Sequence, residues 1–406
     1  MKVYLEPVGA CRRRLLDLER VAEFLSKNDY SMTYNPKIAD FIILFTCAFN
    51  QNKEGNSIKK VDQYSKYKGK VIVSGCLPAI NRDILKKYTN LFEITPIDLK
   101  KFDKIMPHSI SITKIKDKNI LNYSKSNKNV VMLNMLNGMK YQKKSIDKFK
   151  DTFLEQIFLI KKEKVLKSYY IRVGVGCMGN CSYCAIKKAT GKLKSKSLVQ
   201  CVQEFNDGLS KGYNHFSLLG EDVGAYGLDR NTTILNLLQK ICSYKKKYKI
   251  KILDFNPKWI IKYREGLYEL LKEGKIEWIS IPIESGSERI LKYMGRCYDI
   301  KKIIKAIDNM RKIKQDIIIE THIMVGFPKE KREDFRKTLS LLKNLKFDCG
   351  HINSYSDKKG TKSYKILPKV SDGEKVSRMK CIEKILKING YHTYLGGNYE
   401  TIHFFK

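Results

Sequence analysis

Three cysteines stand close together in the middle of the chain, and their spacing is typical of an iron–sulfur site. Cys177, Cys181 and Cys184 form the pattern C-x3-C-x2-C in the stretch GVGCMGNCSYC. Soft thiolate ligands favour such clusters, and three of them can hold three irons of a [4Fe-4S] cluster. The fourth iron then has no protein ligand. The spacing therefore predicts a cluster whose open iron can bind a substrate.

The alternatives for this stretch are a zinc knuckle and a chance group of cysteines. Zinc motifs usually contain two C-x2-C pairs or matched histidines, and no such partner follows here. Gly174, Gly176 and Gly179 also suit a loop that folds tightly around a bulky cofactor, because glycine adopts conformations that other residues avoid. We therefore interpret the stretch as a cluster-binding loop.

The first 90 residues alternate between apolar runs and stretches with helical spacing. The predicted strands lie near 3–7, 41–47 and 71–76, the predicted helices cover 15–26 and 52–67, and 84–88 is expected to belong to a third helix. Runs of β-branched residues separated by helices indicate a βαβαβ unit with a parallel sheet. The predicted fold class of this part is a doubly wound α/β domain.

Each of these three strands is followed closely by a cysteine, namely Cys11, Cys47 or Cys76. Parallel strands end at the same edge of a sheet, which is where such folds place their ligands. We therefore expect the three thiols to converge into a second three-cysteine site. The alternative is that they are small buried apolar side chains, as cysteines often are.

The second half of the chain again alternates strands and helices. The predicted strands are 170–175, 215–220, 250–255, 278–283, 317–325 and 349–355, and the predicted helices are 197–211, 232–245, 262–273, 300–315 and 331–345. Six βα units predict a partial (β/α)6 barrel, whose active site gathers at the carboxyl ends of the strands. The motifs GED at 220–222, PIESGS at 282–287 and VGFP at 325–328 fall at those ends.

The segment between the two halves carries no assignable chemistry. Lysine, serine and asparagine dominate 114–129, which predicts a loop, and 147–164 has the pattern of a basic helix. The predicted domains are 1–150, 165–370 and 371–406.

Composition limits the class of protein. The chain has 406 residues, of which 43% are hydrophobic, and it has eleven cysteines, no signal-peptide pattern at its start and no long apolar run. We therefore expect a globular protein in a reducing cytoplasm, with no membrane partner. The net charge of +37, from 79 basic and 42 acidic residues, indicates a polyanionic partner, nucleic acid first. The alternatives are a solvated lysine surface and an acidic peptide partner.

The cysteine loop, with Tyr183 before its last cysteine, resembles the radical S-adenosylmethionine (SAM) superfamily. Nearly the whole chain resembles one of its families, the methylthiotransferases. The motifs that carry this resemblance are LLGEDVGAYG (218–227), IPIESGSERILKYM (281–294), IMVGFPKEKREDF (323–335) and SYSDKKGTKSY (354–364). The section 182–195 and GEDVGAYG resemble the archaeal and eukaryotic branch, which acts on threonylcarbamoyladenosine beside the transfer-RNA anticodon.

The resemblance implies two [4Fe-4S] clusters, one on each cysteine trio, with the cluster on Cys11, Cys47 and Cys76 as the auxiliary one. It implies SAM contacts at Gly220 and Glu221 for the amino group, at Glu284 and Ser285 near the ribose, and at Val325 and Gly326 near the adenine. The alternative for Glu221 and Glu284 is that they are carboxylates in ordinary salt bridges at the barrel mouth.

The implied reaction uses two SAM molecules. One donates a methyl group to a sulfur atom on the auxiliary cluster, and the other, after reduction, yields a 5'-deoxyadenosyl radical that removes a hydrogen from an unactivated carbon. The carbon then takes up the methylated sulfur. The implied electron donor is a flavodoxin or a ferredoxin. The iron–sulfur clusters and SAM carry the difficult chemistry.

Three positions depart from the family pattern. Ala189, Thr190 and Gly191 replace a triplet that usually contains arginine, so an active-site cation is lost or is supplied by a lysine such as Lys187. Glu284 replaces a glutamine, and the first cysteine stands in ACRRR instead of following a glycine. These departures concern substrate identity more than cluster binding.

The family's usual C-terminal TRAM domain, a small β-barrel that grips transfer RNA, is expected to be absent. Residues 391–406 resemble only its first strand, and one strand cannot make a barrel. Two substrates therefore remain: transfer RNA, and a ribosomally made peptide or protein side chain. A non-catalytic RNA-binding or cluster-carrier protein and a radical-SAM ligase or epimerase are further alternatives.

The other cysteines and all six histidines are given no chemical role. Cys201, Cys242, Cys297, Cys349 and Cys381 are scattered over predicted helices, a strand and a loop, so we expect them to be structural. The histidines show no ligand spacing in the sequence.

Overall fold

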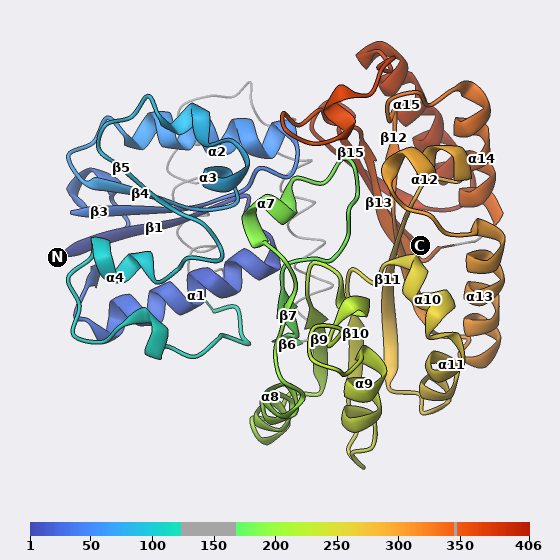
Figure 1. The fold of residues 1–406 in the computed structure, drawn as a ribbon, viewed down its shortest axis with the longest axis horizontal. Helices are drawn as coiled ribbons and strands as arrows, with labels where there is room; N and C mark the ends of the chain where they lie inside the picture. The colour runs from blue at the N-terminus through green and yellow to red at the C-terminus, as the bar shows by residue number, and fades with distance from the viewer. Residues whose placement is uncertain (123–167, 345–346) are drawn as a thin grey trace. The chain divides into compact units, whose positions relative to one another are not determined.

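The computed structural model describes residues 1–122, 168–344 and 347–406 (Figure 1). The chain divides into two compact units: Met1–Lys162 with Ala185–Gly191, and Glu163–Cys184 with Lys192–Lys406. The predicted basic helix at 147–164, part of the loop at 114–129 and the predicted domain boundaries at 150 and 165 lie outside the described residues.

The N-terminal unit contains a five-stranded sheet in which every pairing is parallel, in the order β2-β1-β3-β4-β5. Its strands are β1 (Lys2–Val8), β2 (Ser31–Met32), β3 (Phe41–Thr46), β4 (Lys70–Gly75) and β5 (Leu91–Ile94). All six residues of β3 are buried, as expected for the centre of a parallel sheet covered on both faces. The predicted βαβαβ unit is confirmed.

Helices cover both faces of this sheet. They are α1 (Arg12–Lys27), α2 (Gln51–Tyr64), α3 (Leu77–Ile80) and α4 (Lys101–Ile105). One core contains Val21 and Phe24 of α1, and the other contains Val61 and Tyr64 of α2. The helix predicted at 84–88 is wrong, because a 3-10 turn spans Arg82–Leu85 and the short α3 has already ended at Ile80.

The second unit is built on an eight-stranded sheet in the order β14-β15-β13-β12-β11-β10-β9-β6. Its strands are β6 (Ser168–Arg172), β9 (His215–Leu219), β10 (Lys249–Ile252), β11 (Ile276–Glu284), β12 (Ile318–Val325), β13 (Cys349–Ser354), β14 (His392–Gly396) and β15 (Thr401–Phe405). The six strands from β6 to β13 in this sheet all pair in parallel. This arrangement is the predicted partial (β/α)6 barrel.

The helices of this unit are α8 (Leu198–Ser210), α9 (Ile234–Cys242), α10 (Pro257–Lys262), α11 (Arg264–Lys272), α12 (Glu288–Met294), α13 (Ile300–Ile313), α14 (Arg332–Asn344) and α15 (Asp372–Ile388). Those from α8 to α14 lie between successive parallel strands, and α15 lies between β13 and β14. The helix expected at 262–273 is a pair, α10 and α11, that meets at Tyr263. The short α12 was not predicted; Ser287 caps its first turn, and Gly295, with φ of 71°, ends it.

The C-terminal segment differs from the expected single strand. It forms a hairpin of β14 and β15, and β15 pairs antiparallel with β13 of the barrel sheet (Figure 1). Ile402 and Phe404 of β15 are buried, and Phe404 packs edge-on against Tyr391. The hairpin is therefore an extension of the barrel sheet. Among the described helices, none is both long and apolar enough to cross a membrane.

Candidate functional site

The loop that carries Cys177, Cys181 and Cys184 follows the short strand β7 (Gly174–Val175) and ends before α7 (Ile186–Thr190). The Gly179 amide donates a hydrogen bond to Cys177 Sγ at 3.1 Å. A Cβ built on Gly179 would lie only 3.2 Å from that sulfur. The glycine thus lets a backbone N–H point at the Cys177 sulfur, and hydrogen bonds to sulfur are one way in which proteins tune iron–sulfur clusters.

The three thiols of this loop interact electrostatically. Burial raises the pKa of Cys177 to about 11, the Gly179 amide opposes the rise, and Asp222, Cys184 and Cys181 add to it. Cys177 and Cys181 are half-buried, whereas Cys184 is exposed. The thiols are close enough to disfavour one another's ionisation, and bound iron would offset that cost because metals bind cysteine as thiolate.

The barrel anchors this loop through the end of α12. The Ser182 amide donates to the carbonyl of Met294 at 2.9 Å, and the Ser182 hydroxyl donates to the carbonyl of Tyr293 at 2.7 Å. A Cβ on Gly295 would come within 2.9 Å of the Asn180 carbonyl. Gly295 therefore allows the close approach that fixes the loop against α12.

Tyr183, Glu284 and Arg296 form a buried polar group beside the loop. The Tyr183 hydroxyl donates to Glu284 Oε1 at 3.0 Å, and Arg296 Nη2 lies 3.3 Å from the same oxygen. Arg296 also donates to the Tyr183 hydroxyl at 2.9 Å and to the carbonyl of Pro282 at 2.8 Å. The side chains of Arg296 and Glu284 are each only 10% exposed. The salt-bridge alternative is thus observed for Glu284, and its contact with a ribose stays a prediction.

Arg296 is a cation that sequence reasoning missed. Burial opposes its charge, but Tyr183 and Glu284 outweigh burial and hold its pKa well above the usual value. Nothing in the single sequence marked it, since it follows the end of an unpredicted helix. The expected substitute, Lys187, lies on α7 with Ala189 and Thr190, which belong to the N-terminal unit.

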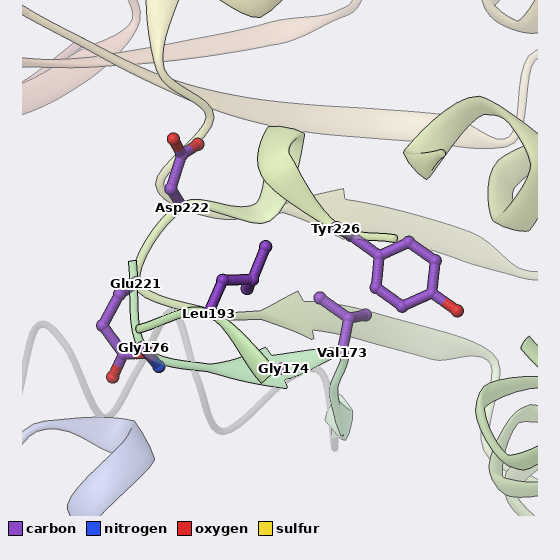
Figure 2. A pocket seen from close by; sticks show the side chains of 8 residues that line it. Val173, Gly174, Gly176, Leu193, Glu221, Asp222 and Tyr226 are labelled. Carbon is purple, nitrogen blue, oxygen red and sulfur yellow. The ribbon is translucent and has the colours of Figure 1, made fainter. Parts of the chain in front are cut away.

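Glu221 ties the end of β9 to the cysteine loop. Its Oε2 accepts a hydrogen bond from the Gly176 amide at 2.9 Å, and Figure 2 shows this carboxylate beside Gly176. A hollow of about 170 Å³ lies here. Its lining is Val173, Gly174, Gly176, Leu193, Gly220, Glu221, Asp222 and Tyr226 (Figure 2). Part of that volume is open solvent, and the hollow has no enclosed room for even a water molecule, so the contacts of Gly220 and Glu221 with SAM stay predictions.

The other predicted SAM contacts lie at the ends of β11 and β12, as the barrel requires. Ser285 is fully buried, and its Oγ accepts from the Ser287 amide at 3.1 Å. Val325 is also buried, while Gly326 turns the chain with φ of 77° and donates its amide to Glu330. The structure thus places these residues at strand ends, and their contacts with SAM stay predictions.

The second cysteine trio converges at one edge of the N-terminal sheet. Val8, Thr46 and Gly75, the last residues of β1, β3 and β4, are direct partners across the sheet. Cys47 and Cys76 follow immediately, and Cys11 stands at the start of α1. Because neighbouring strands end in register, the residues that follow them meet.

The thiols of this second trio act on one another electrostatically. Burial raises the pKa of Cys76 to about 12, and the thiols of Cys11 and Cys47 add to the rise, while Arg14 and Arg13 oppose it. These arginines belong to the ACRRR stretch that departs from the family pattern. The departure therefore supplies positive charge next to the thiols, which favours their ionised form.

Ser57 of α2 holds Cys47 in place. The Cys47 amide donates to Ser57 Oγ at 3.1 Å, and the Ser57 hydroxyl donates to the Cys47 carbonyl at 2.8 Å. Ser57 is fully buried. The loop after β3 is thus fixed on both sides of its cysteine, a constraint that the sequence did not reveal.

Neither trio has the spacing of a single-ion site. Within the described ranges, the one group of three potential ligands that gather within 4.8 Å is Glu320, His322 and His351. In a four-iron cluster each cysteine binds a different iron, so its sulfurs stand farther apart than the ligands of one zinc ion. The cysteine arrangement therefore fits clusters better than zinc.

Some of the histidines, for which the sequence indicates no chemical role, gather in the structure. His322 and His351 gather with Glu320, and His403 contacts His351. The available signal was the alternation Glu320-x-His322, which places both side chains on one face of a strand. Of the remaining cysteines, Cys201 and Cys242 are buried, Cys349 is half-buried, and Cys297 and Cys381 are exposed; a structural role for all five stays a prediction.

Comparison with family models identifies the class. Residues 171–342 match the model of the Radical SAM superfamily, and residues 2–94 match the model of uncharacterized protein family UPF0004. A radical SAM methyltransferase, TsrM from Kitasatospora setae, has the same fold with a TM-score of 0.58 at 9% identity, over 89% of this chain and 74% of that chain. The chain is a radical-SAM enzyme.

Two curated relatives narrow the class. A probable threonylcarbamoyladenosine tRNA methylthiotransferase of Pyrococcus abyssi is 26% identical over 362 residues, 89% of this chain and 78% of the relative. The ribosomal protein uS12 methylthiotransferase RimO of Clostridium kluyveri is 30% identical over 392 residues, 93% of this chain and 80% of the relative. The chain therefore belongs to the radical-SAM methylthiotransferase family, whose cofactors are [4Fe-4S] clusters and SAM.

Proposed function

We propose that this enzyme inserts a methylthio group at an unactivated C–H bond of a modified adenosine beside the transfer-RNA anticodon. The observation that carries the choice of RNA is the net charge of +37, which attracts polyanions. We further propose a reducing cytoplasm and a flavodoxin or ferredoxin as the electron donor.

The cysteine trios carry separate roles in this proposal. Cys177, Cys181 and Cys184 hold the cluster that binds SAM, and Cys11, Cys47 and Cys76 hold the auxiliary cluster. When bound, the two clusters and two SAM molecules supply the reducing electron, the methyl group, the sulfur atom and the hydrogen-abstracting radical. The chain's own task is to bind, to orient and to exclude water.

The barrel residues bind SAM by charge and hydrogen bonding. Glu221 accepts a hydrogen bond from the Gly176 amide of the cysteine loop, which supports a role for its carboxylate as the acceptor for the amino group of SAM. At the strand ends, Glu284 and Ser285 contact the ribose of SAM, and Val325 and Gly326 contact its adenine. Arg296 holds the Glu284 side chain in place through their ion pair.

A peptide or protein substrate is the second candidate. The observation that favours it is the relative with 30% identity, whose name gives ribosomal protein uS12 as its substrate. The same chemistry would then act on a side chain instead of a nucleoside. A surface rich in lysine also binds ribosomal RNA, so charge alone does not separate ribosome-associated protein from transfer RNA.

The deciding experiment is mass spectrometry on reactions of the anaerobically reconstituted enzyme with SAM and a reductant. One tube receives total transfer RNA, and another receives ribosomal protein uS12 with short peptides from the same genome. A methylthio group on an anticodon-loop nucleoside supports the first candidate. A methylthio group on protein or peptide, with RNA unmodified, rejects it in favour of the second.

Salt dependence gives an independent check of the RNA proposal. Neutralised phosphates release counterions, so RNA affinity should fall by about a thousandfold or more between 50 and 200 mM salt if six or more phosphates are contacted. Filter binding of anticodon stem–loop RNA measures this slope. A flat dependence would argue against phosphate contacts and therefore against RNA as the partner that explains the charge.

A further inference from the structure

A group of metal-ligand side chains besides the two cysteine trios lies on the barrel sheet. Glu320 and His322 are on β12, and His351 is on β13 directly opposite His322. Glu320 and His322 are two residues apart, so they share one face of the strand. One donor atom from each of the three side chains lies within 4.8 Å of the others.

This face is the one that helices leave uncovered. Along β12 the side chains of Ile319, Thr321 and Ile323 are buried, whereas Glu320 and His322 retain partial exposure. Helix α15 packs against β12, β13 and β15. The group therefore lies on the inner side of the partial barrel, roughly 10 Å along the strand from Val325, the predicted adenine contact, given about 3.3 Å per residue.

The distances suit ligands that share an ion better than they suit hydrogen bonds. Glu320 Oε1 lies 3.3 Å from His322 Nε2 and 3.4 Å from His351 Nε2. Hydrogen bonds between a histidinium and a carboxylate are shorter, about 2.7–2.9 Å. Tetrahedral zinc with bonds of about 2.0–2.1 Å places neighbouring ligand atoms about 3.3–3.4 Å apart. The observed spacing matches that tetrahedral edge.

Two further side chains orient these ligands through their other atoms. Trp278 Nε1 donates to Glu320 Oε2 at 2.9 Å, which leaves Oε1 directed at the histidines. His403 Nδ1 lies 2.6 Å from His351 Nδ1. If the hydrogen of that bond is assigned to His351, its Nε2 lone pair is available for a metal. Side chains that form hydrogen bonds with the metal ligands and orient them in this way are typical of metal sites.

Access and charge also favour a cation here. The side chains of His322, Glu320 and His351 are 24%, 13% and 38% exposed, which is open enough for an ion to enter. Besides Glu320, the carboxylates of Asp254 and Glu284 act on His322. Glu284 is balanced by its ion pair with Arg296, so Glu320 supplies the charge of the ligand set, which has three protein ligands and a fourth position open, as in catalytic zinc sites.

We propose that Glu320, His322 and His351 bind one divalent transition-metal ion of the zinc type, with Trp278 and His403 as positioning residues. The site does not depend on whether the substrate is RNA or protein. It also gives the C-terminal hairpin a role, because β15 brings His403 to the ligand on β13.

The test measures zinc on the full chain after its clusters have been reconstituted, so that the cysteines are occupied by iron. The protein is incubated with Zn²⁺, freed of unbound metal by gel filtration and analysed for zinc and iron. We expect about one zinc per chain, at least tenfold less in Glu320→Gln and in His351→Asn, and about tenfold weaker retention in His403→Ala. His392→Ala, an exposed histidine on the neighbouring strand β14, is the matched control and should retain zinc fully.

X-ray absorption at the zinc edge separates this site from cysteine binding. Nitrogen and oxygen ligands at about 2.0–2.1 Å, without a sulfur shell at about 2.3 Å, support the proposal. Sulfur ligands, absence of retained zinc in the wild-type chain, or equal zinc in Glu320→Gln and wild type would each overturn it. Unchanged iron content in the variants shows that they remain folded, so a loss of zinc cannot come from unfolding.

Discussion

The two cysteine trios are assembled in opposite ways. Cys177, Cys181 and Cys184 lie within one loop, so their proximity is fixed by the local chain, and a glycine amide bonds to one sulfur directly. Cys11, Cys47 and Cys76 come from three separate strand ends, so their proximity depends on the register of the whole sheet. A local motif tolerates strain elsewhere in the fold, whereas a trio built by topology is only as exact as the strands that carry it.

The largest effects should come from variants that remove one cysteine from either trio. Cys177→Ala should reduce SAM cleavage to the background level, because the loop cluster loses a ligand. Cys47→Ala should keep SAM cleavage while methylthio insertion falls to background. Release of 5'-deoxyadenosine and product mass measure the two activities. Sulfur insertion that survives in Cys47→Ala would falsify the auxiliary-cluster assignment.

The next largest effect should come from breaking the ion pair between Arg296 and Glu284, which lies beside the cysteine loop. Arg296→Ala leaves Glu284 buried without its cation, which typically costs about 3–5 kcal/mol. We expect the urea midpoint of the apo chain to fall and SAM cleavage to drop more than tenfold, with iron at the N-terminal trio unchanged. Arg264→Ala removes an exposed pair with Glu265 and should change stability by less than about 1 kcal/mol. Equal effects of the two variants would contradict a special role for Arg296.

A glycine substitution should disturb the topological trio selectively. Gly75 precedes Cys76 with φ of 104°, and a Cβ there would lie 2.4 Å from the Thr46 carbonyl oxygen. Backbone strain and overpacking each cost about 1–3 kcal/mol, so Gly75→Ala should separate β4 from β3 and reduce iron at this trio severalfold. The measurement is iron per chain in a background without the loop cysteines.

The control for that variant is Gly55→Ala. Gly55 lies in α2, and a Cβ added there would meet no atom within 4 Å, so alanine should stabilise the helix by about 0.5–1 kcal/mol. Iron retention by Gly75→Ala equal to that of Gly55→Ala would show that strand register does not set the cysteine spacing.

The smallest effect should come from removing one hydroxyl, that of Ser57, which forms hydrogen bonds with the backbone of Cys47. Ser57→Ala leaves the buried Cys47 amide without its acceptor, at a cost of about 1–3 kcal/mol. We expect iron at the N-terminal trio to fall a few-fold, while SAM cleavage stays normal. Ser65→Ala, at the exposed end of the same helix, should leave both readouts unchanged. Reduced SAM cleavage in Ser57→Ala would mean that Ser57 acts on more than its own cysteine.

Much of the fold and the cluster residues could be predicted, because their signals are short in range. Apolar runs such as Phe41–Thr46 predict buried strands, and a strand–helix alternation leaves few topologies. The loop cysteines are recognisable from spacing alone. The strand-end trio required one further rule, that parallel strands end at a common edge, and the register of the strand ends at Val8, Thr46 and Gly75 agrees with that rule.

The sequence by itself therefore determined the βα order, the two cysteine trios and the motif positions at strand ends, since each depends on neighbours along the chain or on one topological rule. Only the tertiary structure decided which distant side chains meet. Arg296 reaches Glu284 through the end of α12, and His322, His351 and His403 line up because three strands pair in a particular register. Register depends on packing over the whole sheet, and a shift of one residue would turn these side chains to the other face.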